Sequence, residues 1–371
     1  MKLCIIYNFA QHYRLGIFKC ISEAFDCDFL FGDSMSDVRK LDYGQLRGSV
    51  TETHTHRLHG GWSWQPGVVS LLSKPYTHYI ILGDTRSLST WSFCLLSRLF
   101  YRDKMVYFWS HGWYGKETRI ERILKKVFFR LPNGGVFLYG NYARKLMIQE
   151  GFKPEKLFTI HNSLDYERQV IVRNKLNKTD IYSSHFLNPG YNLVFIGRLT
   201  RVKKLDMVIQ AIKLCQTTGF QVNCTFVGDG TEANKLRSLV NDLGLNDCIW
   251  FYGPCYEEEK IGELIYNADA CVSPGNVGLT AMHCLVYGTP VITHNRFSSQ
   301  MPEFEAVVEG VTGSFFEYGS VNSLSLTIKK WLSEKGSVRE TIRRNCFDEI
   351  DSNWNPDYQI RVIKEQLTKK Q

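Results

Sequence analysis

Two basic residues follow an apolar run in the second half of the sequence and could bind an anion. Arg198 and Lys203 lie in the stretch Gly197–Lys204, which comes directly after the run Leu193–Ile196 and opens a helical pattern. Ligands bind beyond the carboxyl ends of parallel strands, so fixed positive charges in such a loop can reach a diphosphate. A solvated basic loop would have the same composition, and this stretch alone does not decide between the two.

Two further loops of the same half combine glycines with the start of a helical pattern. Val227-Gly228-Asp229-Gly230 is a tight strand-to-helix turn, although it lacks the G-x-G-x-x-G form of dinucleotide-binding loops. The stretch Ser273–Thr280 also follows a strand, and the N–H groups and dipole at a helix N-terminus favour phosphate. Three such loops at one edge of a sheet predict a diphosphate site. Its candidate residues are Gly197, Gly228, Gly230, Asn276, Gly278, Leu279 and Thr280.

These loops require strands that alternate with helices. In the second half, strands are expected at 193–196, 221–227, 249–252, 270–273 and 290–293. The first half alternates in the same way, and such alternation predicts parallel strands joined by helices. We therefore expect an α/β protein of two Rossmann-like domains, with parallel sheets facing a central cleft. The domains would span residues 1–185 and 192–350, joined by a polar linker, and a helix over about 355–371 would cross back to the first domain.

Composition indicates a globular cytoplasmic protein. The chain has 371 residues, 44% hydrophobic and 22% charged, and this length exceeds one ordinary core. The eleven cysteines are scattered without a C-x-x-C pair, which favours reduced thiols in the cytoplasm. The first residues lack a signal-peptide pattern, and the sequence has no apolar run long enough to span a membrane.

Positive charge is concentrated in the first half. Residues 1–185 hold 26 Lys and Arg against 16 Asp and Glu, whereas the remainder holds 19 against 21. An anionic membrane or a phosphorylated acceptor would match this charge, and no RNA-binding signature accompanies it. The basic pattern Glu117–Leu131 fits a helix at the inner face of the cell membrane. It fits equally a core-facing helix with a solvated basic face.

The motifs of the second half resemble those of the group 1 (family 4) glycosyltransferases of the bacterial polysaccharide-biosynthesis type. The resemblance rests, in order and spacing, on Gly197-Arg198-Leu199 with Lys203, Val227-Gly228-Asp229-Gly230, Ala268-Asp269-Ala270, Gly278-Leu279-Thr280, Gly288-Thr289-Pro290-Val291, Pro302-Glu303, Glu309-Gly310 and Thr312-Gly313. In the first half it is looser, and is carried by Trp109-Ser110-His111-Gly112 and Asn162-Ser163-Leu164-Asp165.

This resemblance implies a GT-B fold, a nucleotide-diphosphate sugar as donor and retention of the anomeric configuration. It also implies that neither a metal nor another cofactor is required. Arg198 and Lys203 fall on the family's diphosphate-binding pair, and His111 falls on the residue near the donor sugar. These three residues are the predicted catalytic set.

Two carboxylates of the family pattern are missing. The family carries two Glu separated by seven residues, of which the first reaches the donor sugar and the second the nucleotide ribose. Gly275 and His283 occupy these positions here. A glycine offers no side chain to sugar hydroxyls, whereas His283 could still hydrogen-bond a ribose hydroxyl. Candidates to replace the lost contacts are Asn276, Gln300, Glu303 and Glu305.

Several polar and aromatic residues of the first half are candidates for other sites. His12, Arg14 and Trp113 are assigned to the acceptor side, because they follow expected strands. His54, His56 and His59 form an H-x-H-x-x-H pattern that could bind zinc. No Cys or carboxylate completes that set nearby in the sequence, so we predict a polar acceptor-side loop and no metal site.

The sequence therefore predicts a retaining glycosyltransferase that moves a sugar from a nucleotide-diphosphate sugar to a glycan or lipid-linked acceptor in cell-surface polysaccharide synthesis. Two rivals stay open: a nucleotide-sugar epimerase of the same fold, and a non-catalytic glycosyltransferase-like binding subunit. A phosphorylase is disfavoured, because no lysine context suggests a pyridoxal cofactor. The expected partners are the donor and the acceptor, with peripheral contact to an anionic membrane as an option and no nucleic acid.

Overall fold

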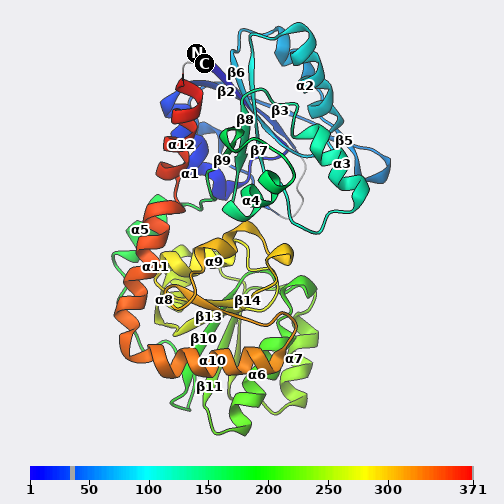
Figure 1. The fold of residues 1–371 in the computed structure, drawn as a ribbon. Helices are drawn as coiled ribbons and strands as arrows, with labels where there is room; N and C mark the ends of the chain where they lie inside the picture. Colours follow the sequence, from blue (N-terminus) through cyan, green and yellow to red (C-terminus); the bar gives the residue numbers. More distant parts are fainter. Residues whose placement is uncertain (34–37, 370–371) are drawn as a thin grey trace. The chain divides into compact units, whose positions relative to one another are not determined.

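A computed structural model describes residues 1–33 and 38–369. The chain divides into two compact units, residues 1–165 with 355–371 and residues 166–354. Each unit is built on its own parallel sheet, and helices connect the strands (Figure 1).

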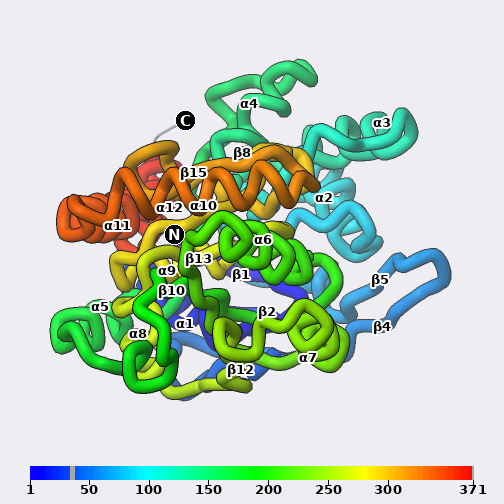
Figure 2. Tube along the Cα trace, turned by 90° about the horizontal axis from the view of Figure 1, so that it is seen from below, coloured from blue at the N-terminus to red at the C-terminus, as the bar shows by residue number. Residues whose placement is uncertain are grey.

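The first unit contains a seven-stranded sheet in the order β3-β2-β1-β6-β7-β8-β9, in which all neighbours run parallel. Its strands are β1 (Lys2–Tyr7), β2 (Asp26–Gly32), β3 (Val50–Thr53), β6 (His78–Leu82), β7 (Met105–Ser110), β8 (Gly135–Leu138) and β9 (Leu157–Thr159). Its helices are α1 (Leu15–Ala24), α2 (Leu88–Phe100), α3 (Arg119–Phe128), α4 (Asn141–Gln149) and α12 (Pro356–Thr368). An antiparallel hairpin of β4 (His56–Arg57) and β5 (Ser63–Trp64) stands off from the sheet (Figure 2).

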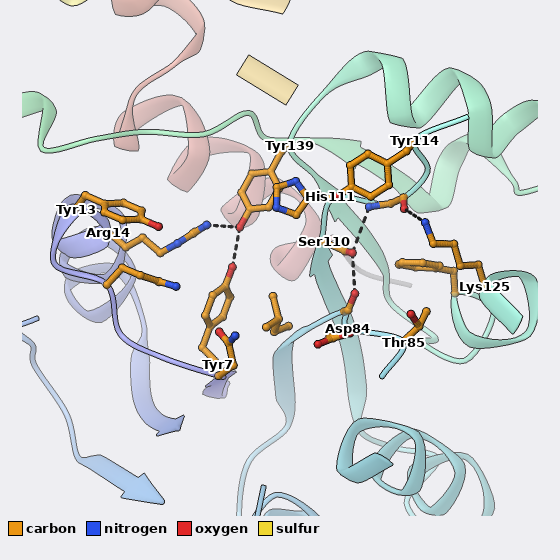
Figure 3. Close-up of a pocket in the computed structure, with 16 residues that line it drawn as sticks. Tyr7, Tyr13, Arg14, Asp84, Thr85, Ser110, His111, Tyr114, Lys125 and Tyr139 are labelled. Carbon is orange, nitrogen blue, oxygen red and sulfur yellow. Dashed lines mark hydrogen bonds between the residues drawn. The ribbon is translucent and has the colours of Figure 1, made fainter. Parts of the chain in front are cut away.

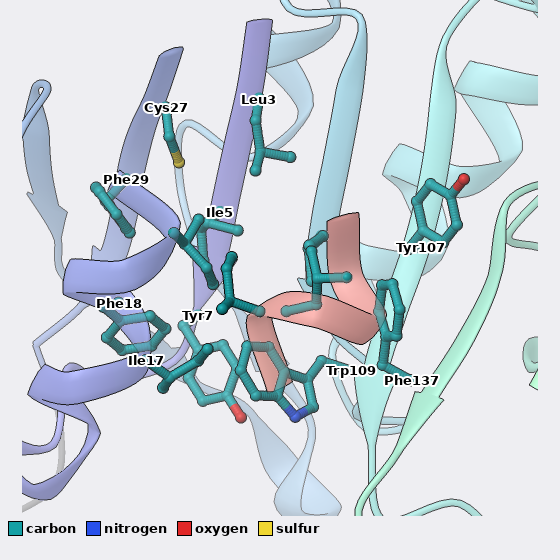
Figure 4. Packing of buried hydrophobic residues seen from close by; sticks show 14 of the residues in the cluster. Leu3, Ile5, Tyr7, Ile17, Phe18, Cys27, Phe29, Tyr107, Trp109 and Phe137 are labelled. Carbon is teal, nitrogen blue, oxygen red and sulfur yellow. The ribbon is translucent and has the colours of Figure 1, made fainter. Parts of the chain in front are cut away.

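The central strands of this sheet are buried on both faces. Along β1, Ile5 and Tyr7 point into one core cluster, whereas Ile6 points into the other, as the two-residue period of a strand requires. Trp109 belongs to the first of these clusters, and other aromatic side chains of the cluster, such as Tyr7 and Phe137, lie around it (Figure 4). Helix α12 closes that cluster beside α1, with Ile363 fully buried. The last helix therefore belongs to the first unit's core.

The second unit contains a six-stranded parallel sheet in the order β12-β11-β10-β13-β14-β15. Its strands are β10 (Tyr191–Ile196), β11 (Val222–Val227), β12 (Ile249–Gly253), β13 (Ala270–Ser273), β14 (Val291–His294) and β15 (Gly313–Phe316). Its helices are α5 (Tyr166–Arg173), α6 (Asp206–Thr217), α7 (Ala233–Asp242), α8 (Glu258–Asn267), α9 (Leu279–Val286), α10 (Val321–Lys335) and α11 (Arg339–Asn353). Helix α10 runs alongside α6 (Figure 2). The strand order changes direction between β10 and β13, and open α/β sheets bind ligands at such a switch point.

The expected domain boundary at residue 185 is corrected by the structure. Residues 166–185 belong to the second unit, because their side chains pack on α8. The Nε2 of Gln169 donates to Glu258, and the buried hydroxyl of Tyr182 donates to the carbonyl of Leu264 at 2.6 Å. The polar composition of this segment thus reflects a packed arm with specific hydrogen bonds, and the second unit runs on to residue 354.

Candidate functional site

The glycine loops at the carboxyl edge of the second sheet pack backbone against backbone. A Cβ atom at Gly228 would lie 2.0 Å from the carbonyl oxygen of Gly197, and one at Gly230 would lie 2.4 Å from that of Leu199. The amide of Leu199 donates to the carbonyl of Asp229 at 2.9 Å. These glycines are therefore required for close approach, and they fix the course of the loop that carries Arg198.

Lys203 reaches from that loop to the start of α9. Its Nζ donates to the carbonyl oxygen of Asn276 at 2.7 Å and lies 3.9 Å from the Cβ position of Gly278. Burial lowers the pKa of Lys203 to about 8; the carboxylate of Glu303 opposes this shift, and the guanidinium of Arg198 adds to it. The predicted pair of cations therefore shares one site with Asn276, Gly278 and the buried Glu303.

Gly275 has a packing reason to lack a side chain. Its Cβ position lies 2.0 Å from the carbonyl oxygen of Val202 and 2.6 Å from the Cα of Lys203. Its amide also donates to the carbonyl of Lys203 at 3.0 Å. The loop after β13 thus touches the lysine segment directly, and a glutamate at 275 would displace it.

The first turn of α9 presents backbone groups toward this edge. Gly278 has φ of 53° and precedes Leu279, the first residue of the helix. The first N–H groups of a helix have no partner within the helix, and the dipole makes that end positive. The hydroxyl of Thr280 turns away, because it donates to the carbonyl of Ile196 at 2.9 Å. Thr280 can therefore offer its backbone, and its side chain anchors α9 to β10.

His283 is engaged by a carboxylate that sequence reasoning missed. Its Nε2 lies 3.0 Å from Oε1 of Glu258, which also accepts from the Tyr287 hydroxyl at 2.6 Å. Burial raises the pKa of Glu258, but hydrogen bonds from His283 and other neighbours more than offset this and lower it to about 2. Of the two ring nitrogens of His283 that could contact a ribose hydroxyl, Nε2 is thus already occupied. No local motif marks Glu258, because it comes from a different helix.

Gln300, a candidate replacement for the lost carboxylates, is a structural residue. Its Oε1 accepts from the amide of Val277 at 2.9 Å, and its Nε2 donates to Thr293 and to the carbonyl of His294. These bonds tie the loop before α9 to β14. Of the other candidates, Glu303 and Glu305 lie in the short helix Pro302–Ala306, and the side chain of Glu303 is buried.

A cavity of about 400 Å³ lies at the carboxyl edge of the first sheet. The cavity is lined by residues at the carboxyl ends of four strands, including Tyr7, Asp84, His111 and Tyr139, together with Arg14. Figure 3 shows Arg14 beside Tyr139 on one side and Lys125 on the other. The cavity therefore combines two of the predicted residues, His111 and Arg14.

His111 is neutral in this cavity. Burial lowers its pKa to about 4, and the charges of Arg14 and Lys125 add to the shift. Its Nδ1 is buried and has no hydrogen-bond partner among residues 1–33 and 38–369. At neutral pH the imidazole carries no charge. Its Nδ1 can accept a hydrogen bond in one tautomer or donate one in the other.

Two predicted acceptor-side residues lie outside the cavity. The exposed His12 places its Nδ1 3.1 Å from the carbonyl of Arg39. Trp113 is buried in the core against Phe129 and Phe152. Neither residue is among those that line the cavity.

The histidines of the β4–β5 region do not form a metal site in the described part of the chain. His54 Nδ1 pairs with Asp33 at 2.6 Å, and its ring contacts that of His56 edge-on. Residues 1–33 and 38–369 contain no group of three or more His, Cys, Asp or Glu side chains that could hold a metal ion. All eleven cysteines are free thiols.

Comparison with known proteins relates the second half of the chain to a described protein family. Residues 177–347 match the family described as glycosyl transferases group 1. These residues form a group 1 glycosyltransferase domain. A 41.2 kDa protein from the cps region of Klebsiella pneumoniae is 24% identical over 231 residues, or 60% of this chain and 58% of that protein. The capsular polysaccharide biosynthesis glycosyltransferase CapM of Staphylococcus aureus is 24% identical over 57% of this chain and 52% of its own length. The chain thus aligns with little more than half of these curated relatives.

Solved structures show the fold of the whole chain. Anabaena Alr3699/HepE in complex with UDP has a TM-score of 0.74 at 16% identity, covering 99% of this chain and 100% of that one. The lipopolysaccharide outer core galactosyltransferase WaaB has a TM-score of 0.70 at 12% identity, with 99% of each chain covered. The predicted GT-B fold is confirmed.

The contact between Gly275 and the lysine segment predicts a strong effect of one added methyl group. Gly275→Ala should displace Lys203 and weaken binding of a nucleoside diphosphate about tenfold or more, because the new Cβ overlaps the Val202 carbonyl. Gly336→Ala is the matched control, since its Cβ meets only Tyr191, at 3.8 Å. Calorimetric titration measures both. Equal affinities in the two variants would contradict this geometry.

The lowered pKa of Lys203 predicts that nucleotide affinity depends on pH. The ammonium loses its proton as the pH rises through about 8, and the neutral amine attracts a diphosphate less. Affinity should therefore fall between pH 7 and pH 9.5, by up to about tenfold per pH unit above 8. Lys203→Arg should flatten this dependence, because arginine stays charged. A wild-type affinity independent of pH in this range would rule out Lys203 as a phosphate contact.

Proposed function

We propose that the protein is a retaining glycosyltransferase that uses a nucleotide-diphosphate sugar and acts in cell-surface polysaccharide synthesis. The observation that carries this proposal is the position of the Lys203 ammonium, next to Asn276 and the Gly278 turn, with Arg198 close enough to influence its pKa. A diphosphate at this point would meet two cations and the positive end of α9. A match to CapM and a fold shared with a UDP complex of Alr3699/HepE support the same assignment.

In the proposed reaction, the bond between the anomeric carbon and the diphosphate oxygen breaks, and the diphosphate leaves with the electron pair. The acceptor hydroxyl forms the new bond to the anomeric carbon and passes its proton to the oxygen of the leaving diphosphate. Arg198, Lys203 and the backbone of Leu279 would stabilise the growing negative charge. Arg198 and Lys203 would balance the negative charge of the leaving diphosphate, so the proposal requires no metal ion. His111 would contribute a hydrogen bond, since its imidazole is uncharged.

The proposed acceptor is a glycan or lipid-linked sugar, reached at the cytoplasmic face of a membrane. Helix α3 supports membrane contact, because Ile120, Ile123 and Val127 are 80%, 66% and 52% exposed. These three apolar side chains face solvent, unlike those of a core-facing helix. Arg122 and Lys126 flank them, although both also pair with Glu150. Among residues 1–33 and 38–369, no helix is long and apolar enough to cross a bilayer.

The donor assignment is tested by a thermal-shift panel of nucleotides and nucleotide sugars, followed by turnover of the one that binds. A ligand that binds only the native state raises Tm. Arg198→Ala and Lys203→Ala should each lower turnover about ten- to a thousandfold, as removal of one transition-state donor does. Nucleoside diphosphate should appear only when acceptor is present and should persist with a chelator. Isomerised donor without acceptor would indicate an epimerase, and binding without any turnover would indicate a non-catalytic subunit.

The membrane assignment is tested by co-sedimentation with vesicles containing anionic lipid. Ile120→Asn with Ile123→Asn should reduce binding about a hundredfold, because each buried isoleucine contributes about 1.5 kcal/mol or more. Leu326→Asn is the control, because Leu326 is an apolar residue on α10 of the second unit that is 62% exposed. Unchanged vesicle binding by the double variant would show that α3 is not the contact.

A further inference from the structure

The cavity of the first unit contains a buried cation without a counter-charge. Arg14 is 6% exposed, and its Nε and Nη1 have no hydrogen-bond partner among the described residues. Its Nη2 donates to the hydroxyl of Tyr139, which is also 2.7 Å from that of Tyr7. The largest electrostatic influences on Arg14 come from Tyr139, Tyr7 and Tyr13, and no described carboxylate is among them.

The surrounding rings compensate this charge only in part. The guanidinium carbon lies 5.1 Å, 5.5 Å and 5.3 Å from the ring centroids of Tyr7, Trp109 and Tyr139. Cation–π contacts attract a guanidinium but leave its N–H donors unused. Burial holds the pKa of Tyr139 well above its usual range, so the phenol stays neutral. Buried charges are normally paired, and a buried arginine with two unused donors is costly unless a ligand completes it.

The other charged groups of the cavity do not remove this imbalance. Lys125 is already paired with Glu117 at 2.7 Å and also donates to the carbonyl of Gly112. Asp84 is the one acidic residue among the described residues that line the cavity; it is exposed and makes no ion pair with Arg14, and its carboxylate accepts from the amide of Arg86. His111 is uncharged. Arg14 is therefore a buried positive charge with two unused donors, and the neutral imidazole of His111 lines the same cavity.

We propose that this cavity binds an acceptor that carries an oxyanion, a carboxylate or a phosphate, through the Arg14 guanidinium. The planar fork of arginine matches both groups. The cavity volume of about 400 Å³ suits a monosaccharide unit with its charged substituent. Asn8 and Thr85 also line the cavity and supply polar groups for neutral hydroxyls. This inference rests on the proposed glycosyl transfer and names the chemical class of its acceptor.

The test compares sugars that differ only in charge. Glucuronate, glucose 6-phosphate and glucose are titrated into the full chain, and binding is followed by the NMR signal of the Arg14 Nε–H group. The two anionic sugars should bind at least about tenfold more tightly than glucose. Equal binding of all three would overturn the proposal, and this arm needs no variant. The tighter of the two anions assigns the substituent as carboxylate or phosphate.

Variants test whether Arg14 is the residue that distinguishes anionic sugars from neutral ones. Binding in the variants is followed by calorimetry, since Arg14→Gln removes the reporter. Arg14→Gln should abolish the preference for anionic sugars, whereas the exposed Arg47→Gln should keep it. A preference that survives Arg14→Gln would overturn the proposal. So would a loss of nucleoside diphosphate affinity in Arg14→Gln with sugar binding unchanged, since Arg14 would then belong to the donor site. Absence of nucleotide binding in the wild type would instead contradict the proposed function, so the two failures are distinguishable.

Discussion

The segment Arg201–Lys204 and the loop after β13 touch through their backbones, and the second unit's candidate site depends on this contact. With no Cβ at Gly275, the two segments come close enough for Lys203 to reach the Asn276 carbonyl and the start of α9. The same closeness removes the ammonium from water and lowers its pKa to about 8. The position of the cation and the missing glutamate at 275 thus have one physical cause.

Each unit keeps an incompletely compensated cation at the carboxyl edge of its own sheet. In the second unit it is Lys203, held by a carbonyl oxygen, and in the first it is Arg14, held by a phenol. Neither arrangement is the most stable that a fold could adopt, because a buried charge that is only partly compensated costs free energy. The carboxylate of Glu303 offsets only part of the burial of Lys203. Such costs concentrate at functional sites, where the ligand supplies the missing charge.

Much of the fold follows from local pattern, whereas the partners within the site do not. Alternating apolar runs predicted both parallel sheets, and the three glycine loops predicted the edge that carries Arg198 and Lys203. Residues 166–185 were assigned to the first domain, because nothing in the sequence marks the hydrogen bonds that Gln169 and Tyr182 make to α8. Glu258 could not be found either, since it bonds to His283, which lies 25 residues further along the chain on another helix. Long-range hydrogen bonds leave no periodic signal in a sequence.

The central claim is that the carboxyl edge of the second sheet holds a diphosphate. Hydrogen–deuterium exchange of the full chain, with and without the nucleoside diphosphate that raises Tm most, tests it directly. The account predicts slower exchange in peptides that cover 197–204 and 275–280, because these backbones would contact the phosphates. Protection confined to residues 1–165, or no protection at a saturating ligand concentration, would contradict it.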